Sequence, residues 1–452
     1  MKDLTTGKEW KRILEFAVPM FIGSIFQQLY NVADSVIVGQ FVGKDALAAV
    51  GGSFPIILLL SSLMMGVTMG TSILIARYYG ARDIDNIKKS VQSGYFILTV
   101  GTILMSTIGM FFAKDMLKGM KVPEEIMGDS VTYLNIMFLG LVGSFGYNTV
   151  SGMLRGLGDS KTPVYFLVLS TVLNVFLDLL FVVVFNRGVA GVAWATLIAQ
   201  LTSFISSLIY LYTQTEVFRF NIFKTPLSKD NLIISMKLGL PTGIQQICLS
   251  LGIITMQSLV NGFGANTMAA FAAASKLDTF ATLPMNNFSL AITTFVAQNI
   301  GANKMRRVKM GIRSTLIMVN ITSFVMTVMV WLFGKELMSI FTNDPEVIKQ
   351  GIDYLKIVGS GYMILGSMFA IAGFIRGTGH TLFPTFVTLT SLWIIRIPVA
   401  EVMTKVIGVN GLWIGIPIGW IFGLLSAVVY YYSGKWKEGT VSKQEIVHRT
   451  AS

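Results

Sequence analysis

The sequence predicts an all-α integral membrane protein in which twelve transmembrane helices form two pseudo-symmetric six-helix bundles with a central cleft. The prediction rests on the composition, on recurring long apolar segments and on an internal repeat. Of the 452 residues, 53% are hydrophobic and 13% are charged, whereas about 25% are charged in soluble globular proteins. Apolar stretches of about twenty residues recur along the whole chain, and each can cross a hydrocarbon layer about 30 Å thick.

Hydropathy and helix-breaking residues divide the chain into twelve predicted spans. They lie near residues 13–41, 46–76, 91–113, 130–154, 163–186, 190–213, 234–261, 267–298, 311–334, 350–375, 384–406 and 411–433. An even number of spans puts both termini on one side of the membrane. The apolar segment that follows the basic first twelve residues is too long for a cleavable signal peptide.

The distribution of basic residues predicts the orientation. Of the 35 Lys and Arg residues, 24 lie on the side of the termini, 9 lie on the opposite side, and Lys276 and Arg396 lie within spans. Because cytoplasmic loops are enriched in Lys and Arg, we expect both termini in the cytoplasm of a bacterial inner membrane. The net charge of +12 then reflects topology and contact with anionic lipid, and requires no nucleic-acid partner.

Residue usage argues against an enzyme. The single cysteine, Cys248, excludes an internal disulfide, and two histidines are too few for a metal cluster. No nucleophile–base motif is present. We therefore expect neither catalysis nor a cofactor, and since nothing in the sequence indicates an oligomer, we expect a monomer.

The two halves of the chain repeat each other at an offset of 221 residues. The matched pairs include Gly43 with Gly264, Gly80 with Gly301, Tyr133 with Tyr354, Arg155 with Arg376, and Pro163 with Pro384. Each half has six spans, so the repeats are parallel, an arrangement typical of transporters rather than channels. We predict an N-terminal lobe at 1–213, a cytoplasmic linker at 214–232, a C-terminal lobe at 233–434 and a cytoplasmic tail at 435–452.

As an ordered set, these motifs resemble the multidrug and toxic compound extrusion (MATE) family, in its DinF-like and MepA-like bacterial branch. The resemblance covers residues 12–433. It is carried by the segment from Pro19 to Gly39, the turns at 43–49 and 80–81, Arg155-Gly-x-Gly158-Asp159 with Pro163, Asn174-x-x-x-Asp178, and the second copy that includes Arg376-Gly-x-Gly379. The resemblance implies a secondary active antiporter that exports small amphipathic organic compounds in exchange for inward H⁺ or Na⁺.

Four polar residues of the first half fall at a similar depth in the membrane. Asp34, Asn174, Asp178 and Thr196 lie roughly 9–18 Å from the predicted outer surface, at 1.5 Å per helical residue. Acids in hydrocarbon are costly, and the oxygens of these side chains suit Na⁺ or a shared proton equally. The family resemblance implies that spans 1, 5 and 6 are adjacent and that these four residues hold the coupling cation. The alternative is that both acids only bond neighbouring helices.

The second half lacks a matching acidic pair, because Asp34, Asn174 and Asp178 map near Thr255, Ile395 and Val399. It carries Lys276, Asp278 and Arg396 within spans instead. These three residues either form a buried network or contact substrate.

Further polar residues and a proline are assigned to the substrate cavity and to a hinge. The weaker candidates for substrate binding are Gln27, Tyr30, Asn148, Gln245 and Gln246, together with Lys276, Asp278 and Arg396. Pro19, within span 1, is a candidate hinge, although a static bend explains it equally well. A flippase for lipid-linked precursors is the alternative function, and it would need a strongly cationic cavity.

Overall fold

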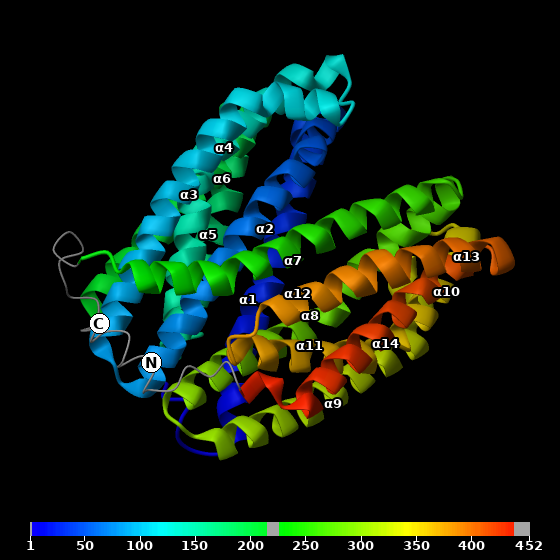
Figure 1. Ribbon diagram of the computed structural model, residues 1–452. Helices are drawn as coiled ribbons and strands as arrows, with labels where there is room; N and C mark the ends of the chain where they lie inside the picture. Colours follow the sequence, from blue (N-terminus) through cyan, green and yellow to red (C-terminus); the bar gives the residue numbers. More distant parts are fainter. Residues whose placement is uncertain (1, 215–225, 438–452) are drawn as a thin grey trace. The chain divides into compact units, whose positions relative to one another are not determined.

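The computed structural model describes residues 2–214 and 226–437, which are almost entirely helical (Figure 1). Most of the predicted linker and tail, at residues 215–225 and 438–452, lies outside the described residues. Helix α7 begins at Lys229, within the predicted linker. Its start is marked by Ser228, whose hydroxyl oxygen accepts a hydrogen bond from the amide of Asn231 at 3.3 Å, as a helix cap does.

Each of the twelve predicted spans corresponds to one helix or to a run of consecutive helices. The first half contains α1 (Glu9–Ile37) with the π-helix η1 (Val38–Val42), α2 (Lys44–Ala81), α3 (Ile84–Gly119), α4 (Glu124–Gly156), α5 (Thr162–Leu179) with the π-helix η2 (Leu180–Val184), and α6 (Gly188–Gln214). The second half contains α7 (Lys229–Asn261), α8 (Ala265–Gly301), α9 (Met305–Ser339), α10 (Pro345–Gly359), α11 (Tyr362–Gly377), α12 (Leu382–Leu389), the π-helix η4 (Thr390–Arg396), α13 (Ile397–Ile407), α14 (Asn410–Ser433) and the short η5 (Lys435–Lys437).

The length and hydropathy of these helices agree with a membrane protein. Over the described residues, ten helices are long and apolar enough to cross a membrane, and the bent pair α10–α11 makes an eleventh. The remaining long helix, α8, has 37 residues. It includes Lys276 and Asp278, which lower its hydropathy. The predicted all-α membrane fold is confirmed.

The chain forms two compact units. Unit 1 contains Lys2 and the chain from Ile22 to Gly243, and unit 2 contains Asp3–Phe21 and the chain from Ile244 onward. The boundaries therefore fall within helices α1 and α7, two residues after Pro19 and two residues after Pro241. The lobes predicted from the sequence, 1–213 and 233–434, instead divide the chain between the end of α6 and the first turn of α7.

The internal repeat is visible in equivalent hydrogen bonds and backbone angles. The hydroxyl of Ser106 donates to the carbonyl of Phe138 at 2.6 Å, and that of Thr327 donates to the carbonyl of Gly359 at 2.7 Å. The two donor residues are 221 positions apart, and so are the two acceptor residues. Left-handed residues recur at the same offset, with φ of 59° at Arg82 and 60° at Asn303. The two units thus share their interhelical geometry.

Span 10 departs from its counterpart in the first half. We predicted one helix near 350–375, but the chain forms α10 and α11, which meet at a bend of 47°. The break falls at Ser360 and Gly361, where the Ser360 hydroxyl donates to the carbonyl of Lys356 at 2.6 Å. Serine and glycine pairs commonly kink helices because the side chain competes for backbone groups. The matching helix of unit 1, α4, is continuous.

In unit 1, α4 lies at the centre and contacts α2, α3 and α6. Glycines allow this close packing. A Cβ added at Gly143 would lie 2.7 Å from the backbone nitrogen of Leu201 on α6. Close approach of small residues is how membrane helices associate without a hydrophobic driving force. It holds α6 firmly beside α4, and α6 carries Thr196.

Candidate functional site

The four residues of the predicted cation site lie together in unit 1. The amide nitrogen of Asn174 on α5 donates to the hydroxyl oxygen of Thr196 on α6 at 3.3 Å. Asp34 on α1 and Asp178 on α5 are neighbours whose carboxyl groups interact directly. Asn174 and Asp178 are fully buried and Thr196 is 4% exposed, whereas Asp34 is half-buried.

Several oxygens of this cluster have no hydrogen-bond partner. Apart from the contact between the two carboxyl groups, no described residue bonds Asp34 Oδ1, Asp178 Oδ1, Asp178 Oδ2 or Asn174 Oδ1, although all four atoms are buried. Buried polar atoms are nearly always bonded, so each exception calls for an explanation. Four hard oxygen donors that face an apolar interior match the ligand preference of Na⁺, and two adjacent carboxyl groups can instead share a proton.

The local backbone explains how α1 and α5 bring their acids together. A π-helical turn follows each acid, η1 beginning four residues after Asp34 and η2 beginning two residues after Asp178. The two π-helices contact each other, and both contact α6. Short π-helical turns within longer helices are frequent at functional sites because they change the direction of side chains.

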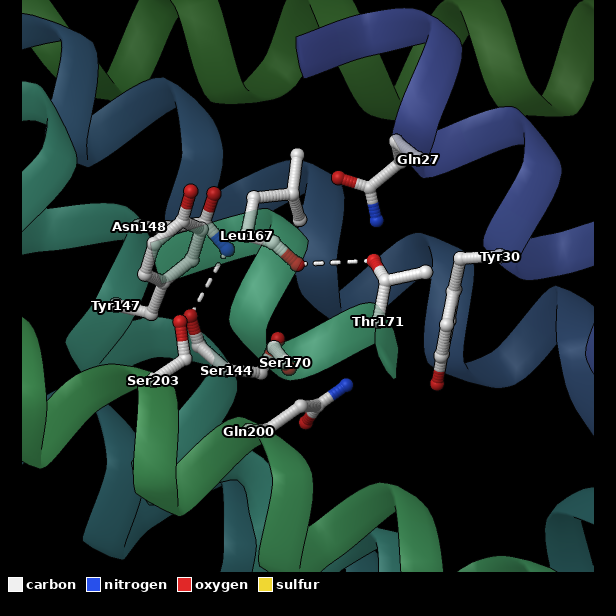
Figure 2. A pocket seen from close by; sticks show the side chains of 10 residues that line it. All are labelled: Gln27, Tyr30, Ser144, Tyr147, Asn148, Leu167, Ser170, Thr171, Gln200 and Ser203. Carbon is white, nitrogen blue, oxygen red and sulfur yellow. Dashed lines mark hydrogen bonds between the residues drawn. The ribbon is translucent and has the colours of Figure 1, made fainter. Parts of the chain in front are cut away.

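A polar cavity of about 60 Å³ lies beside this cluster, also within unit 1 (Figure 2). It is lined by Gln27, Tyr30, Ser144, Tyr147, Asn148, Leu167, Ser170, Thr171, Gln200 and Ser203. The space exceeds what one water molecule needs, about 10–15 Å³ on the same measure. Figure 2 shows the side chains of Gln27, Thr171 and Gln200 converging on it. None of the lining residues is charged.

Tyr30 joins the cavity to the acidic cluster. Its ring lines the cavity, and its hydroxyl donates to the hydroxyl oxygen of Thr196 at 3.3 Å. That oxygen therefore accepts from both Tyr30 and Asn174. Since a hydroxyl also carries one proton, Thr196 can still donate to a carboxylate. Thr196 is thus bonded both to Asn174 of the cluster and to Tyr30 of the cavity wall.

The sequence analysis singled out three of the lining residues, Gln27, Tyr30 and Asn148, and missed the others. Helical spacing held a signal for two of them. Ser170 lies four residues before Asn174, and Gln200 lies four residues after Thr196. Residues at i and i+4 share a helix face, so the faces of α5 and α6 that carry the cluster also line the cavity.

Two of the predicted substrate residues of unit 2, Gln245 and Gln246, lie next to each other on α7. The Gln245 amide donates to the Thr388 hydroxyl at 2.6 Å, and its oxygen accepts from Arg376 at 3.4 Å. Gln246, next to it, is half-buried. Both the nitrogen and the oxygen of the Gln245 amide are therefore bonded to other residues of the bundle.

The charged residues of unit 2 do not form one network. Asp278 accepts a hydrogen bond from the hydroxyl of Tyr362 at 2.8 Å and lies within electrostatic range of Arg396. Lys276 is exposed, and its ammonium lies 5.9 Å from the centre of the Phe341 ring. The side chain of Lys276 therefore has different surroundings from those of the other two.

Two helical units that share an internal repeat, with a polar site inside one of them, are the architecture of a polytopic membrane transporter. The family model MatE matches residues 19–180 and 241–402. The chain is 32% identical over 435 residues to the probable multidrug resistance protein YpnP of Bacillus subtilis, covering 96% of this chain and 97% of that one. It is 24% identical over 429 residues to the multidrug export protein MepA of Staphylococcus saprophyticus, covering 94% and 93%.

The fold also matches that of solved structures. A crystal structure of MATE in the bent conformation superposes with a TM-score of 0.89 at 22% identity, covering 97% of this chain and 98% of that one. The chain therefore belongs to the MatE family, that is, to the MATE transporters. It is a multi-pass membrane transporter of small molecules and not an enzyme.

Proposed function

We propose that this protein is a secondary active antiporter that exports small amphipathic organic compounds in exchange for inward H⁺ or Na⁺. In this proposal the protein acts as a monomer in the bacterial inner membrane, with both termini in the cytoplasm. Asp34, Asn174, Asp178 and Thr196 hold the coupling cation, and the cavity beside them binds the exported compound.

The observation that carries the proposal is the direct contact between the carboxyl groups of Asp34 and Asp178, whose buried oxygens are bonded by no other described residue. A charged acid within a membrane costs about 2.5–3.5 kcal/mol on insertion scales, and two adjacent acids also repel each other. A proton or Na⁺ held between them relieves both costs. Because Asp34 is half-buried while Asp178 is fully buried, a cation can reach the pair from the side of Asp34.

Coupling requires that cation and substrate favour different conformations. The bond from Tyr30 to Thr196 gives a physical route, since a cation drawn to the acids competes for the oxygen that Tyr30 uses. The membrane potential supplies about 2.3 kcal/mol per elementary charge per 100 mV to inward cation movement. This energy expels the bound compound once the cavity has rearranged.

The lining of the cavity supports substrates with aromatic or amide groups, either neutral or singly cationic. Amides and hydroxyls supply hydrogen bonds, and the rings of Tyr30 and Tyr147 supply apolar and cation–π contact. A flippase for anionic lipid-linked precursors would need basic residues, and none of the lining residues is basic. We therefore favour the antiporter.

We further propose that Pro19 is a hinge in α1. It lies two residues before the boundary between the units, and proline removes one backbone hydrogen bond of the helix. Bending at this point would move Asp34, which lies four helical turns later on the same helix. The equivalent Pro241 lies at the same distance from the boundary within α7.

The test is transport by purified protein in proteoliposomes, with a Na⁺ gradient and a pH gradient imposed separately. Efflux of a fluorescent amphipathic cation should follow one of the gradients for the wild type. Asp34→Asn and Asp178→Asn should each abolish the dependence on that gradient. Asp115→Asn, which changes an exposed acid of α3, is the matched control and should transport normally. Full gradient-driven efflux by Asp34→Asn would exclude the proposal.

A further inference from the structure

The first turns of α9 carry a row of basic side chains on one face. Arg306, Lys309 and Arg313 are spaced by three and four residues, so they lie on the same side of the helix. All three side chains are exposed. With a rise of about 1.5 Å per residue, Arg313 lies about 10 Å further along the helix than Arg306. We call these three residues the α9 basic row.

The same face of α9 continues as an apolar surface. Ile317, Ile321 and Phe324 follow Arg313 at spacings of four, four and three residues, and each of them is more than half exposed. The opposite face of the helix is buried within unit 2. The exposed face thus begins with positive charge and goes on as hydrocarbon, which is the order in which a phospholipid presents its phosphate and its acyl chains.

No acid among the described residues compensates the α9 basic row. The only acid of α9 itself is Glu336, near the opposite end of the helix. Within the parts of the chain that the structure describes, no ion pair involves the row. Glu9, the acid that α1 brings to this end of unit 2, is already paired with Arg307 at 3.0 Å. The three charges of the row are therefore available to an external anion.

The start of α1 adds positive charge at the same end of unit 2. Arg307 donates to the carbonyl of Gly7 at 2.6 Å, so the chain just before α1 lies against the first turn of α9. Lys8 and Lys11 follow and are exposed, and Trp10 between them is 49% exposed. Tryptophan is enriched where a membrane meets water, which indicates that this end of unit 2 lies at the level of the lipid headgroups.

Unit 1 does not repeat the α9 basic row. At the offset of 221 residues, the row corresponds to Asp85, Lys88 and Gln92 of α3. The charges of Asp85 and Lys88 cancel, and Gln92 is half-buried. Lys and Arg are enriched on the cytoplasmic side of membrane proteins in general. Since only one of two repeated helices carries the row, this general enrichment does not account for it.

We propose that the α9 basic row binds the headgroup of an anionic phospholipid, in the leaflet on the side of the termini, with the acyl chains against Ile317 and Ile321. Guanidinium groups bind phosphate oxygens in pairs, and a lysine adds a point charge. Arg313 lies within the predicted span 311–334, and its long side chain can reach the headgroup from there. This inference goes beyond the proposed antiport and does not depend on it.

The experiment is native mass spectrometry of the purified full-length protein in detergent, titrated with phosphatidylglycerol or with phosphatidylcholine of the same acyl chains. Both lipids contain a phosphate, but only phosphatidylglycerol has a net negative charge. The spectra count the lipids bound at each concentration and give the affinity. The wild type should bind one phosphatidylglycerol about tenfold more tightly than phosphatidylcholine.

The variant Arg306→Gln/Lys309→Gln/Arg313→Gln removes the row. It should weaken the binding of phosphatidylglycerol by roughly 100-fold, at about fivefold for each lost charge. Exposed side chains outside ion pairs contribute little to stability, so the Tm without added lipid should stay within about 2 °C of the wild type. Arg306→Lys/Arg313→Lys keeps the charges and should keep most of the affinity.

The matched control is Lys114→Gln/Lys118→Gln/Lys335→Gln, which removes three exposed lysines predicted at the opposite membrane surface and should bind as the wild type does. The inference is overturned if the wild type binds both lipids equally, or if the control loses as much affinity as the row variant. It is also overturned if glycerol 1-phosphate, which has no acyl chains, displaces the lipid at equal concentration. Failure of the proposed antiport would leave this result unchanged, because Asp34→Asn should bind phosphatidylglycerol normally.

Discussion

The centres of units 1 and 2 differ in the charged residues that they contain. In unit 1 two carboxyl groups meet, and no described residue outside this pair bonds their buried oxygens. In unit 2 the carboxyl group of Asp278 accepts a hydrogen bond from the hydroxyl of Tyr362 at 2.8 Å. The same repeat thus supports a centre with two carboxyl groups in contact and a centre with one carboxyl group bonded to a tyrosine.

The difference shows how a duplicated fold can divide its tasks. Interhelical bonds such as Ser106–Phe138 and Thr327–Gly359 are retained in both units, because they hold the helices together. The charged residues are not retained, as we expect if only one bundle binds an exchangeable ion. The predictions below test this division, beginning with the largest expected effect.

Replacing Asp178 should have the largest effect on transport. Asp178→Asn removes the fully buried acid of the pair and should lower the affinity for the coupling cation by about 100-fold, the equivalent of the roughly 2.5–3.5 kcal/mol that a bare acid costs in the membrane. The measurement is the cation dependence of substrate efflux in proteoliposomes. An unchanged cation affinity would mean that the two centres do not differ in function.

The segment before Pro19 offers a second contrast between the units. In unit 2, Arg307 binds Glu9 at 3.0 Å and the carbonyl oxygen of Gly7 at 2.6 Å. In unit 1, Asn231 at the start of α7 accepts from Tyr78 at 3.2 Å and donates to Ser90 at 3.2 Å. The start of α1 is thus held by an ion pair, and the start of α7 is held by hydrogen bonds between uncharged groups.

Arg307→Ala should therefore cost about 3 kcal/mol of unfolding free energy, since it leaves a shielded carboxylate unpaired. Asn231→Ala should cost about 1–2 kcal/mol. Denaturant unfolding in detergent measures both values, and hydrogen exchange of residues 3–21 reports on the released segment. Arg306→Ala, which removes the exposed neighbouring arginine, serves as the control and should have little effect. Equal costs for Arg307→Ala and Arg306→Ala would show that the ion pair does not anchor the segment.

Thr196 should contribute less than the acids. Thr196→Val removes the hydroxyl that accepts from Tyr30 and Asn174 and should lower the cation affinity about tenfold, the equivalent of one lost hydrogen bond of 1–1.5 kcal/mol. Thr202→Val is the matched control on the same helix, because the hydroxyl of Thr202 bonds only to its own helix, at Ile198. If both variants behave alike, Thr196 is not part of the cation site.

The smallest effect should come from the cavity wall. Gln200→Leu removes an amide that points into the cavity (Figure 2), and should raise the KM for an amide-bearing substrate by roughly fivefold. Gln245→Leu, in unit 2, should instead lower the Tm without changing the KM, because the Gln245 amide is occupied by Thr388 and Arg376. The contrast fails if Gln245→Leu changes the KM more than Gln200→Leu does.

Much of the fold could be predicted from the sequence because the membrane imposes strong rules. Every backbone polar group in hydrocarbon must be bonded internally, so long apolar segments become helices, and all twelve spans were predicted. The repeat was readable because glycines at tight turns are retained, as at Gly43 and Gly264, which have φ of 114° and 91°. The break at Ser360 was missed, since hydropathy is continuous across it.

For the candidate site, the depth of each residue in the membrane could be predicted from the sequence. The contacts between the side chains could not. Counting residues along each helix placed Asp34, Asn174, Asp178 and Thr196 at one level. Helical rotation decides which way each side chain points, and the π-helical turns at η1 and η2 alter that rotation without any clear sequence signal. The same limit applied to Lys276, which lies close to Asp278 in sequence but faces Phe341.

The sequence by itself determined the membrane environment, the helix count, the duplication and the residues that are costly to bury, because each of these follows from hydrophobicity and spacing along one segment. Only the tertiary structure decided which of those costly residues meet. It brought the acids of unit 1 together, gave Asp278 a hydrogen bond from a tyrosine, and opened a neutral cavity beside Tyr30. Such pairings depend on how helices far apart in sequence rotate and pack, which no single segment encodes.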